Sequence, residues 1–321
     1  MGPSSDPGAG PSGAGAGSPG GTCLWHPDRG TALSCTRCGR PACPECLRPA
    51  SVGFHCRQCV ADFMAATAGS RGIAPRTVAG ARLIDRPLVT PVLIALNVVA
   101  FLLTAFQSGS ATDLSGSQLF VDGALIPAEV ASGEYYRLLT AGFLHGSLIH
   151  IAANMISLFF LGGPLERILG RGRFLTHYLV SLFGASVSVM LFSEPVSVTI
   201  GASGAIYGLL GALVVAFKRM RADLRQLIVV VALNVWITFQ FPGISWQGHL
   251  GGLVVGAAIG AAMVYPPSRT RNAWQWGAVA AMVVALTVTL VLRDQAIGPW
   301  ICETSPDRIS CIPEYFIRPP R

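Results

Sequence analysis

The sequence predicts an all-α membrane protein that carries a small metal-binding region ahead of its membrane helices. Of its 321 residues, 51% are hydrophobic and only 12% are charged, whereas soluble domains are about 25% charged. Apolar runs long enough to span a bilayer recur from residue 89 onward. Cysteines gather instead between residues 23 and 59, in short-spaced pairs that are typical of zinc ligands.

The N-terminal part divides into a tail, a metal-binding module and a linker. Residues 1–21 are almost entirely Gly, Pro, Ser and Ala, a composition that cannot build a core, so we expect a disordered tail. Residues 22–62 contain "CLWH", "CTRC", "CPEC" and "CRQC". In a cytoplasmic segment such pairs favour two tetrahedral zinc sites over disulfides, and the zinc would hold the small module folded. The expected ligands are Cys23, His26, Cys35, Cys38, Cys43, Cys46, Cys56 and Cys59.

Two pairings of these ligands are open. Interleaved pairing, which we favour, joins Cys23 and His26 with the third pair and leaves the second pair to bind with the fourth. Sequential pairing is the alternative. The module resembles B-box-type or ribbon zinc fingers, so a regulatory role or a protein partner is expected for it. Residues 63–86 are expected to form a linker.

The positive charges show how the apolar segments cross the membrane. Lys and Arg concentrate in the loops 164–173, 218–225 and 266–273, while the alternate loops are mostly acidic. The positive-inside rule places the basic loops in the cytoplasm. The N-terminus is then cytoplasmic, and the C-terminus lies outside the cell membrane after an odd number of spans. The expected spans are 89–106, 147–163, 174–192, 203–217, 226–241, 248–265 and 274–292.

This charge distribution also explains the net charge of +7, so no nucleic-acid partner is expected. The first six spans define a core over 87–265, and residues 266–293 hold a linker and a seventh span. The connection 107–146 is apolar for a loop and is expected to contain short interfacial helices. Cys302 and Cys311, in the extracytoplasmic tail 294–321, either form a disulfide or stay free.

Polar side chains within the spans are costly and tend to mark function. Ser203 lies 15 residues before Lys218, the first cytoplasmic charge, which places it about 22 Å above that end. The same calculation puts His249 and His150 about 24 Å, and Asn154 about 18 Å, above their cytoplasmic ends. These side chains, from three helices, therefore share a layer beneath the outer face. Because Ser203 starts its helix below that face, the preceding "PVSVTI" must enter the membrane as non-helical backbone.

Ser203 and His249 suggest a nucleophile and its general base. Ser203 stands at a helix start, where unpaired N–H groups can stabilise an oxyanion. "GASGAIYG" and "GHLGGLVVGAAIG" give two glycine-lined faces that can pack closely, and Tyr207 lies one turn from Ser203. No Asp or Glu occurs between Glu194 and Asp223, or between Asp223 and Asp294. The sequence therefore predicts a Ser–His dyad without a carboxylate, and no cofactor for catalysis.

These motifs, together with "YYRLLTAGFLHGSLIHIAANMISLFFLGGPLERILG", resemble the rhomboid family of intramembrane serine proteases over about residues 86–265. The resemblance implies a rhomboid-like six-helix bundle plus one C-terminal helix, and it assigns nucleophile and base to Ser203 and His249. It implies His150 and Asn154 in the oxyanion hole and Tyr207 stacked on the histidine. Tyr136 stands where the family has the Trp of a Trp-Arg motif.

The resemblance further implies that the substrates are transmembrane proteins in the lipid bilayer, which enter past the segment 226–241. Rhomboid-like pseudoenzymes, which bind client transmembrane helices without cutting them, are the alternative class. They lack the serine or the histidine, and this chain has both. We therefore favour the hypothesis that the protein is a protease.

Overall fold

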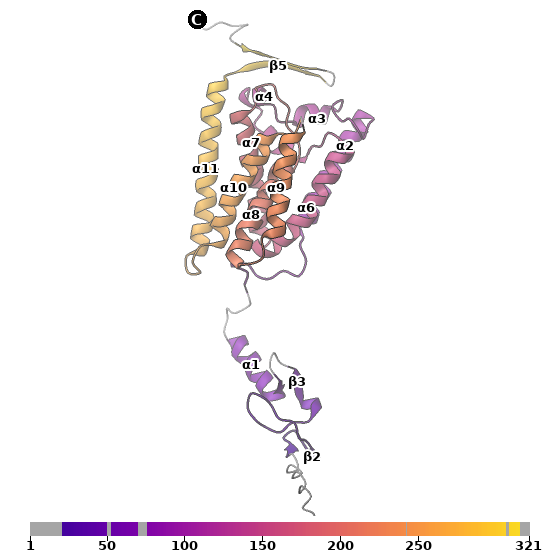
Figure 1. The fold of residues 1–321 in the computed structure, drawn as a ribbon. Coiled ribbons are helices and arrows are strands. Elements are labelled where there is room, and N and C mark those ends of the chain that lie inside the picture. Colours follow the sequence, from indigo (N-terminus) through magenta and orange to yellow (C-terminus); the bar gives the residue numbers. More distant parts are fainter. Residues whose placement is uncertain (1–20, 50–52, 70–75, 242, 306–307, 315–321) are drawn as a thin grey trace, which may run out of the picture. The chain divides into compact units, whose positions relative to one another are not determined.

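A computed structural model describes residues 21–49, 53–69, 76–241, 243–305 and 308–314. The expected tail 1–21 lies, except for its last residue, outside this part of the chain. The chain divides into two compact units, residues 1–74 and 75–321 (Figure 1), which are described one at a time.

The first unit is built around its cysteines. Strands β1 (Thr22–Cys23) and β2 (His26–Gly30) form one antiparallel pair, and β3 (Leu47–Pro49) and β4 (Phe54–Cys56) form another. A 3₁₀ turn, η1 (Pro44–Cys46), precedes β3, and helix α1 (Arg57–Gly69) follows β4. The buried cluster consists almost entirely of cysteines, with Ala42 and Leu47 added. Such a core buries little apolar surface, as expected for a metal-dependent module.

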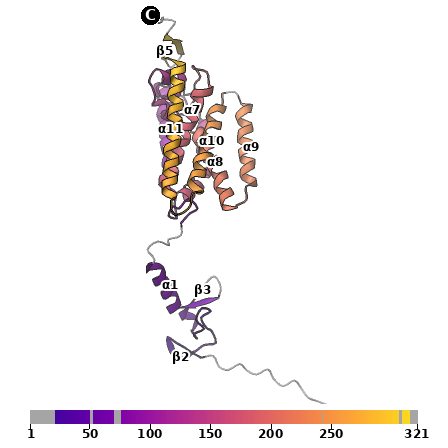
Figure 2. The same cartoon turned by 90° about the vertical axis from the view of Figure 1, so that its left-hand side faces the viewer.

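The second unit is a helical bundle (Figure 2). Six of its helices, counted over the described residues, are long and apolar enough to cross a membrane. They are α2 (Val89–Ser108), α6 (Leu148–Leu169), α7 (Arg171–Phe192), α8 (Ser203–Met220), α10 (Trp246–Val264) and α11 (Arg271–Ile297).

The expected span 226–241 forms a shorter apolar helix, α9 (Arg225–Gln240). Its 16 residues reach about 24 Å, less than the hydrocarbon thickness of about 30 Å. Residues 221–224 connect α8 to it, and residues 241–245 lead on to α10. The predicted set of apolar segments is thus present, with the fifth shorter than a full span.

Glycines bring α8 and α10 into backbone contact. A Cβ atom built on Gly252 would lie 2.7 Å from the carbonyl carbon of Gly204, and one on Gly256 would lie 2.6 Å from the carbonyl carbon of Gly208. No larger residue fits at these crossings without parting the helices. The predicted close packing of the two glycine-lined faces is therefore confirmed, and it fixes where the first turns of α8 and α10 meet.

The segment 63–86 is not a simple linker, which corrects the sequence-based expectation. Helix α1 extends to Gly69, and residues 76–88 lie against the bundle with Ala79 and Ala81 buried. Gln275 of α11 donates to the carbonyl of Ala79 at 3.0 Å. At the start of α2, the buried Glu166 accepts hydrogen bonds from the N–H groups of Leu88, Val89 and Thr90 and from the Thr90 hydroxyl, at 2.7 to 2.9 Å.

The connection 107–146 contains short helices, as expected: α3 (Gln118–Gly123), α4 (Pro127–Ala131), α5 (Arg137–Thr140) and the 3₁₀ turn η2 (Ala141–Phe143). The buried Arg137 holds them together. Its guanidinium pairs with Glu134 at 2.7 Å and donates to the carbonyls of Val121 and Ala124. This loop is therefore an ordered layer over one end of the bundle.

The C-terminal segment also packs onto this layer. Strands β5 (Trp300–Ser305) and β6 (Arg308–Pro313) pair antiparallel, and a disulfide joins Cys302 to Cys311. The Ser132 hydroxyl donates to the carbonyl of Trp300 at 2.8 Å. Of the two states left open for Cys302 and Cys311, the structure therefore has the disulfide.

Candidate functional site

Ser203 and His249 meet at one end of the bundle. The Ser203 hydroxyl lies 2.8 Å from Nε2 of His249. Ser203 is the first residue of α8, and His249 lies in the first turn of α10, so the glycine contacts between these helices set the distance. The hydrogen bond has the geometry that a general base needs to take the serine proton.

Tyr207 packs flat against the imidazole, one turn along α8 from Ser203. The two ring centroids are 4.1 Å apart and the ring planes differ by 17°. The tyrosine hydroxyl donates to the backbone carbonyl of Asn234 in α9 at 2.7 Å. Stacking of this kind restricts the imidazole to one plane without adding a charge.

A partner of His249 that sequence reasoning missed is Thr238 of α9. Its Oγ1 lies 2.8 Å from Nδ1 of His249, the ring nitrogen that Ser203 does not contact. A signal for it was present in the sequence. Asn234 and Thr238 are four residues apart and therefore share one face of an otherwise apolar helix. Threonine is common in membrane helices, so this signal is weak by itself.

Extended backbone leads into α8, as the sequence predicted. Leu125 and Thr199 form a two-way β-bridge, and the Gly201 N–H donates to the carbonyl of Ala141. Gly201 has φ of +115°, and a Cβ at this position would lie 2.8 Å from Nε2 of His150. A glycine is needed here for both reasons, and it lets the chain turn sharply just before Ser203.

A cavity of about 510 Å³ opens beside Ser203 and His249, and His150, Asn154 and Tyr207 also line it. Its lining contains no Asp or Glu among the described residues. No side chain caps the N-terminus of α8, so backbone N–H groups around Ser203 lack helical acceptors. A carbonyl oxygen beside Ser203 would meet donors from this terminus. The amide of Asn154 donates to the His150 carbonyl at 2.9 Å, which orients that side chain.

Other histidines lie away from the dyad or out of the cavity. His145 is fully buried, and its ring centroid is 4.9 Å from that of His150. His177 is buried with Nε2 2.9 Å from the carbonyl oxygen of Gly256, which agrees with a packing role. Trp236, in the segment 226–241 past which the resemblance implies substrate entry, is 58% exposed on α9.

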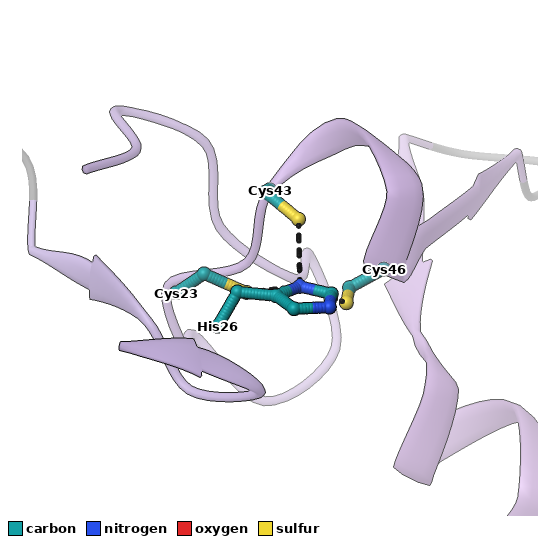
Figure 3. A group of neighbouring side chains, drawn as sticks. All are labelled: Cys23, His26, Cys43 and Cys46. Carbon is teal, nitrogen blue, oxygen red and sulfur yellow. Dashed lines mark hydrogen bonds between the residues drawn. The ribbon is translucent and has the colours of Figure 1, made fainter. Parts of the chain in front are cut away.

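The cysteine-rich unit contains two four-residue clusters that could hold metal ions. Figure 3 shows the first, in which the thiols of Cys23, Cys43 and Cys46 surround the imidazole of His26. The second consists of Cys35, Cys38, Cys56 and Cys59. In each cluster the ligand atoms lie within 4.8 Å of one another. The clusters combine the first pair with the third and the second with the fourth, which is the interleaved grouping favoured from the sequence rather than the sequential one.

Distances within the clusters fit a tetrahedral zinc ion. Nδ1 of His26 is 3.4 Å from the sulfurs of Cys43 and Cys46 and 3.9 Å from that of Cys23. Zn–S and Zn–N bonds of about 2.3 and 2.0 Å imply N···S separations of about 3.5 Å and S···S separations of about 3.8 Å. The sulfurs of Cys38 and Cys56 are 3.7 Å apart. The donor set and spacing therefore fit zinc.

Electrostatics in the second cluster support the same conclusion. Burial and hydrogen bonds with the neighbouring thiols raise the pKa of Cys59 to about 12. Burial also acts to raise the pKa of Cys35, but hydrogen bonds, led by the Cys56 amide, lower it to about 6. A cation bound among the four thiols would stabilise their ionised forms.

Comparisons with known proteins identify the bundle. Residues 132–266 match the family model described as the Rhomboid domain. The chain is 37% identical over 186 residues to rhomboid protease GluP of Bacillus subtilis (strain 168), covering 56% of this chain and 36% of the relative. It is 35% identical over 153 residues to RHOMBOID-like protein 5 of Arabidopsis thaliana, covering 45% of this chain and 49% of the relative.

A third relative is matched over most of its length. RHOMBOID-like protein 6, mitochondrial, of Arabidopsis thaliana is 34% identical over 229 residues, which cover 62% of this chain and 74% of the relative. With its six span-length apolar helices, the chain is a multi-pass membrane protein, and it belongs to the rhomboid family.

Proposed function

We propose that the protein is an intramembrane serine endopeptidase that cleaves transmembrane segments of other membrane proteins with a Ser203–His249 dyad. The observation that carries this proposal is the 2.8 Å contact between Ser203 Oγ and His249 Nε2, beside a cavity large enough for an extended peptide segment. Rhomboid proteases among its relatives support the reaction class.

The proposed reaction has two halves. In the first, Ser203 Oγ attacks the peptide carbonyl while Nε2 of His249 takes the hydroxyl proton, and the imidazolium then protonates the leaving amine. In the second, a water molecule loses a proton to His249 and attacks the acyl-enzyme, which releases the carboxylate product and restores the Ser203 hydroxyl. The stacked Tyr207 keeps the ring in the plane that serves both transfers.

Negative charge develops on the carbonyl oxygen in both halves. We assign its stabilisation to the N–H of Ser203, at the uncapped start of α8, and to the side chains of His150 and Asn154. Removing one such donor from an oxyanion hole typically lowers kcat by about 10²- to 10³-fold. His150→Ala and Asn154→Ala should each produce losses of this order if they donate to the oxyanion.

Loop charges support the orientation. The site is at the end where α8 and α10 begin, and the basic segments 218–225 and 266–273 lie at the other ends of these helices. With basic loops in the cytoplasm, the site opens near the extracytoplasmic face of the cell membrane. The N-terminus is then cytoplasmic, and the C-terminal hairpin extracytoplasmic.

We assign two structural zinc ions to the N-terminal module, one to each four-residue cluster. When bound, the zinc neutralises the thiolates and holds the strand pairs together. The module lies outside the matched rhomboid region, so we assign it to docking of a protein partner rather than to chemistry.

The test compares cleavage of a model transmembrane substrate, and fluorophosphonate labelling, by purified full-length protein in detergent. Ser203→Ala and His249→Ala should both abolish cleavage, and Ser203→Ala should abolish labelling. Ser197→Ala is the matched control, because this hydroxyl donates to the Glu194 carbonyl within its own loop at 2.8 Å and does not line the cavity. Cleavage by wild type and by Ser203→Ala at equal rates would refute the dyad, and substrate binding without cleavage by the wild type would favour the non-catalytic client binder.

A further inference from the structure

The distal nitrogen of His249 has a defined hydroxyl partner that the dyad leaves unexplained. Thr238 Oγ1 lies 2.8 Å from Nδ1 of His249, and its side chain is only 3% exposed. Of the residues of α9, all of which the structure describes, Thr238 alone is buried. A helix that leaves its other side chains at least partly exposed thus inserts one hydroxyl against the imidazole.

This hydroxyl belongs to a closed cluster of four polar contacts. Thr238 Oγ1 also lies 2.6 Å from the Tyr207 hydroxyl and donates to the Asn234 carbonyl at 2.8 Å. The Tyr207 hydroxyl is itself 2.7 Å from the same carbonyl. The Asn234 carbonyl can only accept, so it fixes the direction in which the hydroxyl protons point.

Counting protons in the cluster distinguishes the two neutral forms of the imidazole. If Nδ1 carries the proton, the cluster has three donors: Nδ1–H donates to Thr238, Thr238 donates to the Asn234 carbonyl, and Tyr207 donates to Thr238 or to that carbonyl. If Nε2 carries the proton, two donors remain, and Thr238 must turn its hydroxyl from the carbonyl to Nδ1. The Nδ1–H form therefore makes one more hydrogen bond within the cluster than the Nε2–H form. Because the cluster is buried, an unmade hydrogen bond there costs free energy, which favours the Nδ1–H form.

The Nδ1–H form is also the one that catalysis needs. It leaves Nε2 with a free lone pair toward the Ser203 hydroxyl, so the ring can accept the serine proton at once. In serine proteases with a triad, a carboxylate selects this form and orients the ring, and changing it to an amide selects the wrong one. The cavity lining offers no carboxylate among the residues that the structure describes.

We propose that Thr238 is a positioning residue that holds His249 in the Nδ1–H form and in line with Ser203. This inference rests on the proposed function of Ser203 and His249 and goes beyond it, because it makes the dyad depend on a third helix. Thr238 does not line the cavity, and its hydroxyl contacts Tyr207, Asn234 and His249. It acts through the imidazole, as an uncharged counterpart of the triad carboxylate.

Dependence on α9 has a physical consequence. This helix lies at the outer edge of the bundle (Figure 2), and its buried polar contacts to α8 and α10 are the cluster just described. Outward movement of α9 by more than about 1 Å would break hydrogen bonds of 2.6 to 2.8 Å. The imidazole is therefore held ready only while α9 is in place.

The experiment compares Thr238→Val with Thr238→Ser in full-length protein in detergent. Valine keeps the shape and removes the hydroxyl, while Tyr207 keeps the Asn234 carbonyl as its acceptor, so the stacked ring stays supported. We expect Thr238→Val to lower kcat and the rate of fluorophosphonate labelling by roughly 10- to 100-fold with KM nearly unchanged. Serine restores the hydroxyl, and we expect it to recover most of the rate.

Thr287→Val is the matched control. Thr287 lies in α11, is exposed, and donates to the carbonyl four residues earlier, as Thr238 does in α9. The same substitution there should leave kcat and KM at wild-type values. Thermal unfolding of all variants shows that losses in rate are not losses of folded protein.

Several results would overturn the proposal. Wild-type kcat and labelling in Thr238→Val would show that the hydroxyl does not position the ring. A raised KM with unchanged kcat would show that Thr238 serves substrate binding, and an equal loss in Thr238→Ser would show that packing rather than the hydroxyl matters. The proposed function fails separately, through Ser203→Ala: if that variant cleaves like the wild type, the dyad itself is wrong.

Discussion

Gly252→Ala is the sharpest test of the idea that glycine contacts set the geometry of the dyad. A Cβ on Gly252 would lie 2.7 Å from the carbonyl carbon of Gly204 and still closer to its oxygen. Non-bonded carbons prefer about 3.5 to 4.0 Å, so α8 and α10 must part by about 1 Å. Gly252 is three residues from His249, and Gly204 adjoins Ser203, so the separation acts directly on their 2.8 Å hydrogen bond.

We expect this variant to lose roughly 100-fold in cleavage rate, because a displacement of about 1 Å in a catalytic arrangement can cost that much. Overpacking should also lower stability by about 1 to 3 kcal/mol. The assays are cleavage of a transmembrane substrate under saturating conditions and thermal unfolding in the same detergent.

The control is Gly277→Ala in α11, where a Cβ would meet nothing within 4 Å. Alanine is favoured over glycine in a helix by about 1 kcal/mol, so this variant should be as active as the wild type and no less stable. If Gly252→Ala keeps the wild-type rate, helix contact does not determine the geometry of the dyad, and the reasoning is wrong.

Three further predictions concern parts of the molecule outside the dyad. Glu166→Gln, in α6, replaces one of the carboxylate oxygens that accept from the N–H groups at the start of α2 with an N–H₂ donor. We expect thermal unfolding to show a loss of about 2 kcal/mol of stability, with unchanged activity per folded molecule. Cys35→Ser should reduce the zinc content, measured by metal analysis, and make the N-terminal module sensitive to protease, while the bundle still cleaves substrate; retained zinc would contradict the assigned ligand set. Burial raises the pKa of Glu129 above its unfolded value, so the folded protein should lose stability as pH rises through the folded pKa. Glu129→Gln should remove this loss when unfolding is followed from acidic to neutral pH, and an unaltered pH profile would count against it.

The fold and the contact between Ser203 and His249 can be predicted because their signals are strong and local. Ser203, His150 and His249 are conspicuous in apolar segments, and helix rise alone placed them in one layer. The glycine series on two segments indicated which helices meet. These inferences use properties of single helices, which sequence periodicity records well.

Other features depend on contacts between distant segments, which periodicity does not record. The candidate metal ligands share one spacing within each pair, so the grouping of the pairs could be favoured but not decided from the sequence; the structure places the Cys56 N–H 3.2 Å from the Cys35 sulfur. Residues 76–88 carry no helical pattern, and their packing depends on Gln275, almost 200 residues later. Thr238 was missed for the same reason, because its importance comes from His249 on another helix.

A carboxylate could not replace Thr238 at low cost, and Glu166 shows why. The Glu166 side chain is buried in the same bundle, where four donors at 2.7 to 2.9 Å satisfy its oxygens. Around Thr238 the neighbours are a carbonyl, one phenol and the imidazole, and the carbonyl would repel an anion. A buried charge without enough donors costs several kcal/mol, and lipid offers no water to offset it. A hydroxyl accepts from Nδ1 and donates to the carbonyl at once, so it orients the ring without placing an uncompensated charge in the membrane.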